Sequence, residues 1–394
     1  MRVIIAAFSI LLLLGATPSP SPTELARSRI DTMLRTGHAD PAWFSQTFLT
    51  QIPASYVDQV IAGLTKRLGT YQSVEFAPEK FIAHFTGGTD DVLIHLDTDN
   101  KIDGLLFKPP AIKTSSIDDA LRSLARFSGI VSYVIVKEGR SESAALNPST
   151  PLAVGSAFKL AVLNGLLDEI KRRSRRWDQV VPLAAQWKSL PSGILRNWPS
   201  GTPLTLATYA AEMISISDNT AADALIRIVG PDALRPYAAG NVPFLTTREA
   251  FILKSSAAEN FRAIYIAAGT PAARAVVLRR IYAFPLPTIA NLVTTPILAI
   301  EWHYSVRELC NLMRRVAELP LMSINPGVAD ASAFRHVAFK GGSDFGIINL
   351  TTMVTTRRGT RFCFSATLND PQRAIDEQSF ESAYGAVLPH LASL

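Results

Sequence analysis

The stretch 154–167, VGSAFKLAVLNGLL, is almost wholly apolar, yet it carries one charged residue, Lys159. Gly155 interrupts the preceding chain and Ser156 suits the first turn of a helix, so the stretch predicts a buried helix that continues at least to Ile170. Positions three apart on a helix lie on the same face. The hydroxyl of Ser156 and the amine of Lys159 are therefore predicted to be neighbours at the positive end of this helix.

Two interpretations of this lysine follow from its surroundings. An amine among apolar side chains is poorly solvated, which disfavours its charged form, lowers its pKa and lets it act as a base toward Ser156. Alternatively, the lysine extends along an apolar helix to the surface and Ser156 only caps the helix. Because one S-x-x-K pattern arises easily by chance in 394 residues, the motif alone favours the second interpretation. Partner motifs are needed to favour the first.

Length and composition describe an ordinary globular chain. Of the 394 residues 48% are apolar and 18% charged, so the chain can build a sizeable core and is long enough for two domains. The net charge of +6 comes partly from a basic run without interleaved aromatic residues, which favours a solvated helix end over a nucleic-acid site. We therefore expect no nucleic-acid partner. The run consists of Lys171, Arg172, Arg173, Arg175 and Arg176.

Residues 1–22 have the pattern of a secretory signal peptide. One positive charge precedes an apolar run over 3–14, and small residues and a Ser/Pro stretch follow, with cleavage expected between Ala16 and Pro22. The run is shorter than the about 20 residues that span a membrane, so an uncleaved anchor is the weaker alternative. We expect an exported protein, periplasmic or extracellular, with no stable membrane span after cleavage.

The sequence contains no motif for a metal or a cofactor. H-E-x-x-H, C-x-x-C, D-x-D-x-D-G and a phosphate-cradling glycine loop are all absent, and so is the G-x-S-x-G of Ser-His-Asp hydrolases. The two cysteines, Cys310 and Cys363, match no metal-binding spacing; in an oxidising compartment they either pair or remain as two buried free thiols.

Residues 23–112 are predicted to form a small α+β domain. Helices are expected over 23–35 and 54–68, and strand-like runs separated by turn signals follow. A linker is expected around Pro109 and Pro110, where the strand-like pattern stops. The strand-like runs cover 71–77, 81–85, 91–97 and 101–107.

The order of elements in this small domain is similar in outline to the nuclear-transport-factor-2-like domains. In one interpretation His84, His95 and Asp97 line a pocket there. In the other, which the pattern favours, they are isolated polar residues on the solvent face of half-exposed strands.

Two further motifs follow the Ser156 stretch in residues 113–394. Ser217-Asp218-Asn219 lies where one predicted helix ends and the next begins. Lys340-Gly341-Gly342-Ser343 ends a predicted strand, and a long alternating run then turns back at 357–359 into another strand. S-x-x-K, S-D-N and a motif close to K-T-G, in this order, are the signatures of penicillin-recognising serine enzymes.

With these motifs, residues from about 115 to 394 resemble the class A β-lactamase and penicillin-binding-protein family. The match lies in GSAFK, in the block 189–226 and in KGGS. The resemblance implies an α/β (α+β) fold, in which a helical subdomain lies beside a five-stranded antiparallel sheet with covering helices and the active site lies between them. The small domain that precedes it places the chain among the two-domain members.

The resemblance also assigns roles to the motif residues. Ser156 is implied to be the acylated nucleophile and Lys159 its base, while Ser217 passes a proton to the leaving group. Asn219 is implied to hydrogen-bond the amide of the substrate, and Lys340 to orient Ser217 and an anionic substrate.

The same resemblance implies how the substrate carbonyl and the S-D-N loop are held. The oxyanion hole is implied to consist of the backbone N–H groups of Ser156 and Ser343, with Gly342 beside them at the substrate-binding edge. Asp218 is more plausibly structural and holds its loop.

Two departures from the family pattern affect substrate and turnover. Gly341 replaces a hydroxyl residue that normally helps to hold the carboxylate of a β-lactam, and Ser343 either substitutes for it or carboxylate recognition is weak. Deacylation normally uses a glutamate, for which Glu249 is the candidate, although its companion Leu-Asn pair is absent. The alternative, slightly favoured, is that Glu249 pairs with Arg248 or caps a helix. Glu301 is a second candidate.

These observations predict an exported active-site-serine hydrolase that opens the amide bond of a small-molecule β-lactam through an acyl-enzyme on Ser156. One alternative is an esterase or a D-alanyl-D-alanine peptidase that acts on peptidoglycan-type substrates with the same catalytic centre. A second is a slow or inactive penicillin-binding or ligand-binding protein. Neither the physiological substrate nor the oligomeric state follows from the sequence.

Overall fold

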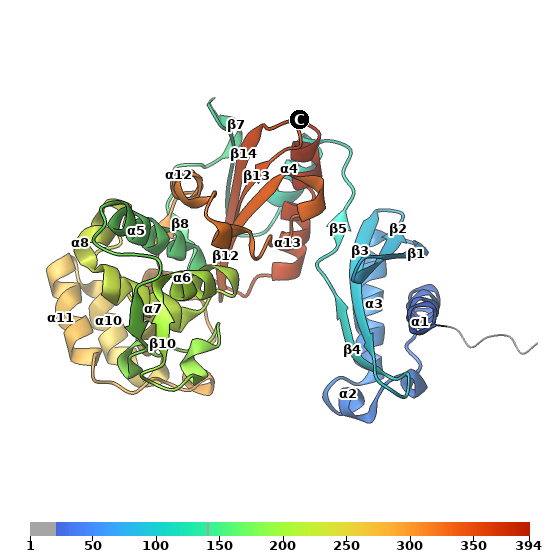
Figure 1. Cartoon of the computed structure of the whole chain (residues 1–394), viewed down its shortest axis with the longest axis horizontal. Coiled ribbons are helices and arrows are strands. Elements are labelled where there is room, and N and C mark those ends of the chain that lie inside the picture. Colours follow the sequence, from blue (N-terminus) through green and yellow to red (C-terminus); the bar gives the residue numbers. More distant parts are fainter. Residues whose placement is uncertain (1–20, 140–141) are drawn as a thin grey trace, which may run out of the picture. The chain divides into compact units, whose positions relative to one another are not determined.

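The computed structural model describes residues 21–139 and 142–394, and the chain divides into two compact units, Met1–Pro110 and Ala111–Leu394 (Figure 1). Most of the expected signal peptide, residues 1–20, lies outside the described residues. Within the described ranges, no helix has both the length and the apolar character needed to cross a membrane.

In its described part, residues 21–110, the first unit contains three α-helices and an antiparallel meander. Helix α3 has the expected bounds and buries Val57, Ile61 and Leu64, whereas Tyr56 is exposed. The strands pair in the order β1-β2-β3-β4, and each neighbouring pair is antiparallel. The elements are α1 (Pro22–Thr36), α2 (Gln46–Gln51), α3 (Ala54–Leu68), β1 (Tyr71–Ala77), β2 (Lys80–Phe85), β3 (Gly88–Leu96) and β4 (Ile102–Phe107).

The polar residues considered for a pocket in this unit do not converge. His84 pairs with Glu75 at 3.3 Å, while the exposed ring of His95 bonds to Asp103. Asp97 accepts hydrogen bonds from backbone N–H groups of its own turn. These contacts agree with the favoured interpretation, in which the three residues lie on the solvent face of the sheet.

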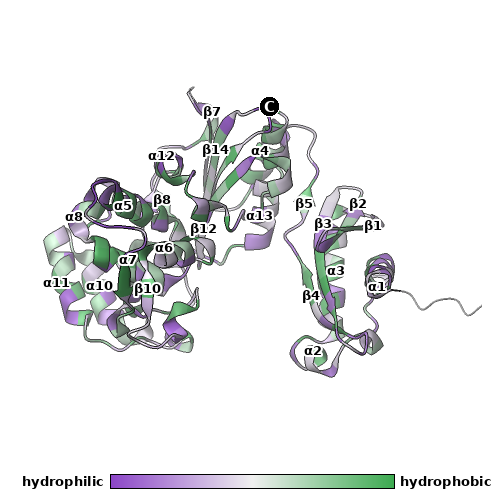
Figure 2. Ribbon diagram, viewed as in Figure 1, coloured by the Kyte–Doolittle hydropathy of each residue, from purple (hydrophilic) through white to green (hydrophobic). Residues whose placement is uncertain are grey.

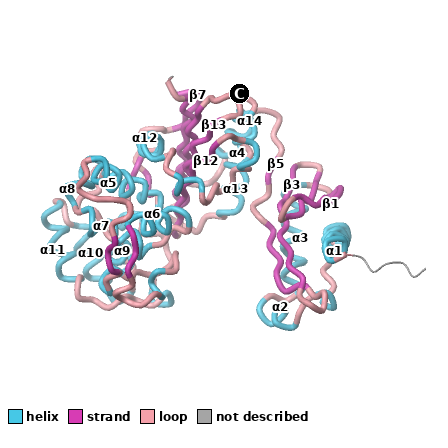
Figure 3. Tube along the Cα trace, in the orientation of Figure 1, coloured by secondary structure: helices cyan, strands magenta, loops and turns pink. Residues whose placement is uncertain are grey.

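A five-stranded antiparallel sheet forms the centre of the second unit, with strand order β12-β13-β14-β6-β7. The turn between β13 and β14 lies at the expected place, around Gly359. Nearly every residue of β13 and β14 is buried, because α12 covers one face of the sheet and α4, α13 and α14 cover the other (Figure 3). The strands are β6 (Ile130–Lys137), β7 (Glu142–Leu146), β12 (His336–Asp344), β13 (Ile347–Thr355) and β14 (Arg361–Asn369).

The helices between β8 and β12 form a subdomain around α5. Every residue of α5 from Lys159 to Leu167 is buried, and α5 and α7 are among the most hydrophobic helices in Figure 2. The helices of this unit are α4 (Ile117–Ala125), α5 (Lys159–Lys171), α6 (Leu206–Ser215), α7 (Asn219–Val229), α8 (Pro231–Leu234), α9 (Thr247–Leu253), α10 (Glu259–Ala267), α11 (Pro271–Ile281), α12 (Val306–Val316), α13 (Glu377–Gly385) and α14 (Leu388–Ala392). Short strands are β5 (Ala111–Ile112), β8 (Leu152–Ala153), β9 (Val180–Pro182), β10 (Pro203–Thr205) and β11 (His303–Tyr304).

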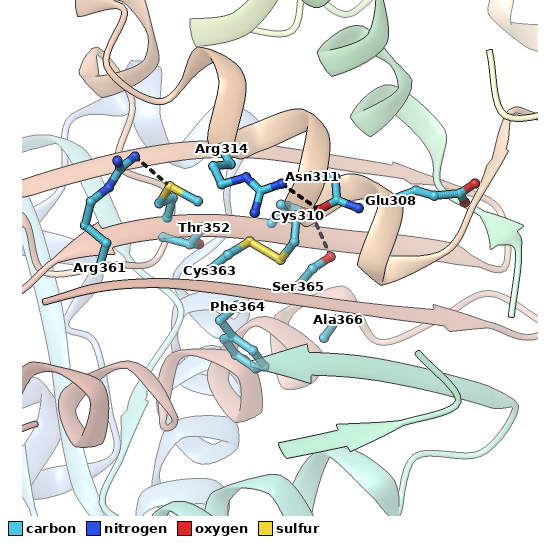
Figure 4. Close-up of a disulfide and its surroundings, with 12 residues drawn as sticks. Glu308, Cys310, Asn311, Arg314, Thr352, Arg361, Cys363, Phe364, Ser365 and Ala366 are labelled. Atoms are coloured by element: carbon cyan, nitrogen blue, oxygen red, sulfur yellow. Dashed lines mark hydrogen bonds between the residues drawn. A yellow bond between two sulfur atoms is a disulfide. The ribbon is translucent and has the colours of Figure 1, made fainter. Parts of the chain in front are cut away.

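Cys310 and Cys363 form a disulfide, which decides between the two alternatives left open by the sequence. Figure 4 shows the bond running from helix α12 to strand β14, with Arg314 and Arg361 nearby. It fixes to the sheet the helix that covers one of its faces.

Candidate active site

Ser156 lies in a single turn of 3₁₀ helix, η2 (Gly155–Phe158), that leads directly into α5. Gly155 has φ +50°, and a Cβ there would lie 2.9 Å from the backbone nitrogen of Ser343. A Cβ on Gly342 would lie 2.3 Å from the backbone nitrogen of Ser156. The backbones of η2 and β12 therefore touch without intervening side chains, which brings the N–H groups of Ser156 and Ser343 to the same place.

Lys159 is fully buried and its amine is surrounded by oxygen atoms. Its Nζ lies 3.0 Å from Oγ of Ser156 and 3.1 Å from Oγ of Ser217. The same nitrogen donates to the backbone oxygen of Ser217 at 2.5 Å and to Oδ1 of Asn219 at 2.7 Å. The predicted neighbourhood of hydroxyl and amine is therefore present, and Lys159 does not extend to the surface.

The electrostatic surroundings of Lys159 favour its neutral form. Burial lowers the pKa of Lys159 well below its usual range, and the nearby charge of Lys340 lowers it further, while Asp218 and Asp223 oppose the shift. A neutral amine has two N–H groups, which suffice for the two carbonyl oxygens of Ser217 and Asn219, and one lone pair. That lone pair is available to accept the proton of a serine hydroxyl.

Ser217 lies between two amines. Its hydroxyl is 3.0 Å from Nζ of Lys340, on β12, as well as 3.1 Å from Nζ of Lys159. Burial lowers the pKa of Lys340 to about 7, so this amine changes its charge near neutral pH. Ser217 itself has φ +59°, a left-handed conformation that is uncommon for a residue with a side chain and typical of functional turns.

The side chains of the other two residues of the S-D-N motif, Asp218 and Asn219, form hydrogen bonds with other groups of the protein. Asp218 caps α7 by accepting the N–H of Ala221, and it also accepts the N–H groups of Ile194 and Leu195, as expected of a structural residue. Asn219 accepts from Lys159 and donates to the backbone oxygen of Leu190 at 3.2 Å. Its side chain therefore positions Lys159 before any substrate is present.

A cavity of about 520 Å³ joins these groups. Phe158 and Trp302 line it, and so do residues of the edge strand β12. The motif residues that line it are Ser156, Ser217, Asn219, Lys340, Gly342 and Ser343. The sequence thus predicted residues from three separate segments that the fold brings together at one cavity.

Glu249 does not line this cavity. One of its carboxylate oxygens accepts the N–H of Thr246 at 2.8 Å in a capping box at the start of α9, and the other pairs with Arg227 at 2.7 Å. The assignment of Glu249 as the deacylating base is therefore not supported by its geometry. The capping alternative describes it, with Arg227 in place of the expected Arg248.

Glu301, the second candidate for the deacylating base, does line this cavity, where it belongs to a buried ion cluster whose other members, Lys254 and Asp344, the sequence did not single out. Nζ of Lys254 pairs with Asp344 at 2.6 Å and with Glu301, which is also buried. Burial raises the pKa of Glu301 to about 7, and its Oε2 has no hydrogen-bond partner among the described residues. Lys254 ends an apolar helical stretch, AFILK, which is the same signal that singled out Lys159.

Comparisons with known proteins agree with this fold. Residues 114–286 match the model of a family described as the β-lactamase enzyme family. A β-lactamase from Sphaerobacter thermophilus is 20% identical, covers 72% of this chain and 97% of its own, and superimposes with a TM-score of 0.50. A β-lactamase from Chitinophaga pinensis is 16% identical, with 70% and 97% covered and a TM-score of 0.49. No curated protein matches the chain. The Sphaerobacter comparison shows that the second unit shares the fold of a β-lactamase, as the sequence predicted.

Proposed function

We propose that this chain is a serine hydrolase that forms an acyl-enzyme on Ser156 and opens β-lactam amide bonds, and the match of residues 114–286 to the model of the β-lactamase enzyme family supports this proposal. One observation carries the proposal: the buried amine of Lys159 lies 3.0 Å from Oγ of Ser156 and within 3.1 Å of Oγ of Ser217. An amine kept neutral by burial is a base placed at its nucleophile.

In the acylation step, Oγ of Ser156 attacks the substrate carbonyl while its proton passes to Nζ of Lys159. The oxyanion that forms is met by the backbone N–H groups of Ser156 and Ser343, whose proximity follows from the contact between Gly342 and η2. Losing one such donor typically lowers the rate about 100- to 1000-fold. When the carbon–nitrogen bond breaks, the proton on Lys159 is relayed by the hydroxyl of Ser217 to the leaving nitrogen.

Lys340 supports the relay from the opposite side of Ser217. Its amine, 3.0 Å from Oγ of Ser217, orients that hydroxyl toward the cavity. Because the pKa of Lys340 is about 7, its positive charge is present below neutral pH and is lost above it.

A second function uses the same centre on ester or peptide substrates. It is favoured by Glu249, whose carboxylate is engaged with Thr246 and Arg227 and does not line the cavity of Ser156. It is favoured also by Gly341, which offers no hydroxyl to a substrate carboxylate. If the acyl-enzyme is hydrolysed slowly, the chain would behave as a penicillin-binding protein.

A time course of intact mass separates these functions. The protein is mixed with benzylpenicillin and, separately, with a p-nitrophenyl ester. Ser156→Ala is the test variant and Ser256→Ala, an exposed serine outside the cavity, is the matched control.

An adduct that forms and clears with benzylpenicillin supports the β-lactamase proposal, and one that persists supports the penicillin-binding alternative. Turnover of the ester alone supports the esterase. If neither reagent adds to the wild-type chain, or if Ser156→Ala reacts as fast as Ser256→Ala, the proposal of an acyl-enzyme on Ser156 is wrong.

We also propose that the protein is exported. The pattern of residues 1–22 and the disulfide between Cys310 and Cys363 support this proposal, because such bonds persist in oxidising compartments. Fractionation of the native host, followed by sequencing of the mature N-terminus, tests it. A chain that keeps Met1 and stays in the cytosol would contradict it.

A further inference from the structure

We propose that the cavity beside Ser156 selects acyl substrates that carry a positively charged group, and that Glu377 and Glu381 of α13 receive that group. This inference rests on the proposed acyl-enzyme and adds the charge of the substrate to it.

The two lysines that line the cavity are not available to an anionic substrate. Lys254 is paired with Glu301 and Asp344. Lys340 bonds to Ser217 and to the backbone oxygen of Gly341, and burial lowers its pKa to about 7. Neither amine offers a full, unpaired positive charge at neutral pH.

Two of the carboxylates that line the cavity, Glu377 and Glu381, have no such pairing with a lysine. Glu377 and Glu381 are four residues apart on α13, so they lie on one face of the helix, an arrangement of like charges that destabilises a helix. Burial and the neighbouring carboxylates raise the pKa of both, and in the described part of the chain no cation contributes to either. A pair that costs stability, and to which no cation of the described residues contributes, fits an external cation.

Glu301, which also lines this cavity, supports the same inference. Glu301 is buried, and its Oε2 accepts no hydrogen bond from residues 21–139 or 142–394. With a pKa of about 7, Glu301 is partly ionised at neutral pH, and in the ionised form its oxygens can only accept, so a donor at Oε2 would stabilise that form. An ammonium or guanidinium group of a substrate supplies both the donor and the charge.

The position at which a substrate carboxylate would be expected is unfavourable for one. Gly341 has no hydroxyl, and the side chain of Ser343, the possible substitute, donates toward the carboxylate of Glu377. A second carboxylate at Ser343 would lie against Glu377 and Asp344. Like charges this close repel, whereas a cation would be attracted to both.

The test compares acyl donors that differ only in charge. They are the p-nitrophenyl esters of 4-(trimethylammonio)butanoic acid and of 5,5-dimethylhexanoic acid, its neutral isostere, with the p-nitrophenyl half-ester of glutaric acid as the anion. Ampicillin and benzylpenicillin, which differ by one ammonium group, provide the same comparison for β-lactams. The acylation rate of Ser156 is measured by intact mass for the full-length protein.

We expect the cationic ester to acylate about tenfold faster than the neutral isostere and the anionic ester to be slowest. In the double variant Glu377→Gln/Glu381→Gln the ratio of cationic to anionic rates should fall by about 10- to 100-fold, since each partly exposed ion pair contributes up to about threefold to tenfold. Glu259→Gln, at the corresponding first position of α10, should leave all rates unchanged.

Three results would overturn the inference: equal rates for the cationic and neutral reagents, an unchanged ratio in the double variant, or an equal loss in Glu259→Gln. In these cases acylation of Ser156 still stands. If none of the five reagents acylates Ser156, the proposed function fails together with the inference. Thermal melts of each variant, compared with the wild type, show whether α13 remains folded.

Discussion

At the scale of single residues, Lys159 is the group on which the proposed chemistry depends. Its amine serves two carbonyl oxygens and two hydroxyls at once, all within 3.1 Å. The sequence predicted its burial from the apolar neighbours of Lys159. The partners could be expected only through the order of three motifs, because Ser217 and Asn219 are about 60 residues away along the chain.

Replacement of Lys159 tests this role. Lys159→Met keeps the apolar stem but removes the base, so we expect the acylation rate of Ser156 to fall by about 10²- to 10⁴-fold. Lys159→Arg should be equally slow, because a guanidinium stays protonated. Stopped-flow acylation with a chromogenic ester measures both. An arginine variant with the wild-type rate would contradict the role of Lys159 as a base.

Lys340 predicts a dependence of stability on pH. Its folded pKa of about 7 lies below the about 10.4 of lysine in an unfolded chain. Between these values the unfolded state holds more protons, so the free energy of unfolding of the wild type should rise with pH through this window.

The slope for one such group is on the order of 1 kcal/mol per pH unit. Lys340→Met lacks this term, so its stability relative to the wild type should be most favourable at pH 6 and decline toward pH 9. Urea unfolding of both proteins at pH 6, 7.5 and 9 measures the difference. A difference that is the same at all three values would refute the assignment.

For Glu249 the sequence offered two predictions, and the structure agrees with the slightly favoured one, a helix cap. The sequence Thr246-Thr247-Arg248-Glu249 has the S/T-x-x-E pattern of a capping box, which fixes its carboxylate at the start of α9. That local signal was readable and competed with the family expectation. By contrast, the pairing of Lys254 with Asp344 joins residues 90 apart in the sequence, and no local pattern reports it.

At the scale of elements, the contact between η2 and β12 sets the geometry of the proposed oxyanion hole. It is made by backbone on backbone, because Gly155 and Gly342 lack the Cβ that would separate the two segments. The sequence predicted the helix and the strand, and the family pattern supplied the glycines. Only the three-dimensional arrangement of η2 and β12 shows why position 342 has no room for a side chain.

Gly342→Ala should therefore impair acylation without touching a catalytic side chain. The added Cβ would lie 2.3 Å from the nitrogen of Ser156 and 2.4 Å from the oxygen of Val154, so η2 must shift. We expect a loss of at least 100-fold in the acylation rate, comparable with the loss of one oxyanion donor. Gly269→Ala, where the new Cβ meets nothing within 4 Å, is the control and should react normally. A Gly342→Ala variant as fast as Gly269→Ala would contradict this account.

Helix and strand bounds were predicted well where local signals were strong. Helix α3 begins after Pro53 and ends at Gly69, as its start and stop signals indicate. Strand β3 begins at Gly88, earlier than the expected residue 91. The N–H group of Gly87 donates to the backbone oxygen of Leu68, which holds the preceding turn against the end of α3. The sequence predicted an alternating strand at β13, and helices on both faces of the sheet bury it almost completely.

At the scale of the whole molecule, the disulfide ties the helical layer to the sheet within the second unit. Cys310 and Cys363 are 53 residues apart, and closing a loop of that length in the unfolded chain stabilises the folded state by about 4 kcal/mol in the chain-entropy model. The sequence left the pairing open, because spacing alone does not show that α12 packs on β14.

The double variant Cys310→Ala/Cys363→Ala tests this contribution. Its free energy of unfolding should be lower by about 2–5 kcal/mol, because the unfolded chain regains its freedom. Urea unfolding of the variant, beside the wild type with and without a reducing agent, measures the loss. Equal stability of all three samples would show that packing alone holds α12 on the sheet.

The same bond has a practical consequence for preparing the protein. In the cytosol of an ordinary expression host thiols stay reduced, so a chain made there folds without the covalent tie between α12 and β14. A deficit of about 4 kcal/mol is a large part of the 5–15 kcal/mol that holds a typical protein folded. The yield of soluble, reactive protein should therefore depend on secretion into the periplasm or on an oxidising host strain, and a low yield from the cytosol would say nothing about the competence of Ser156.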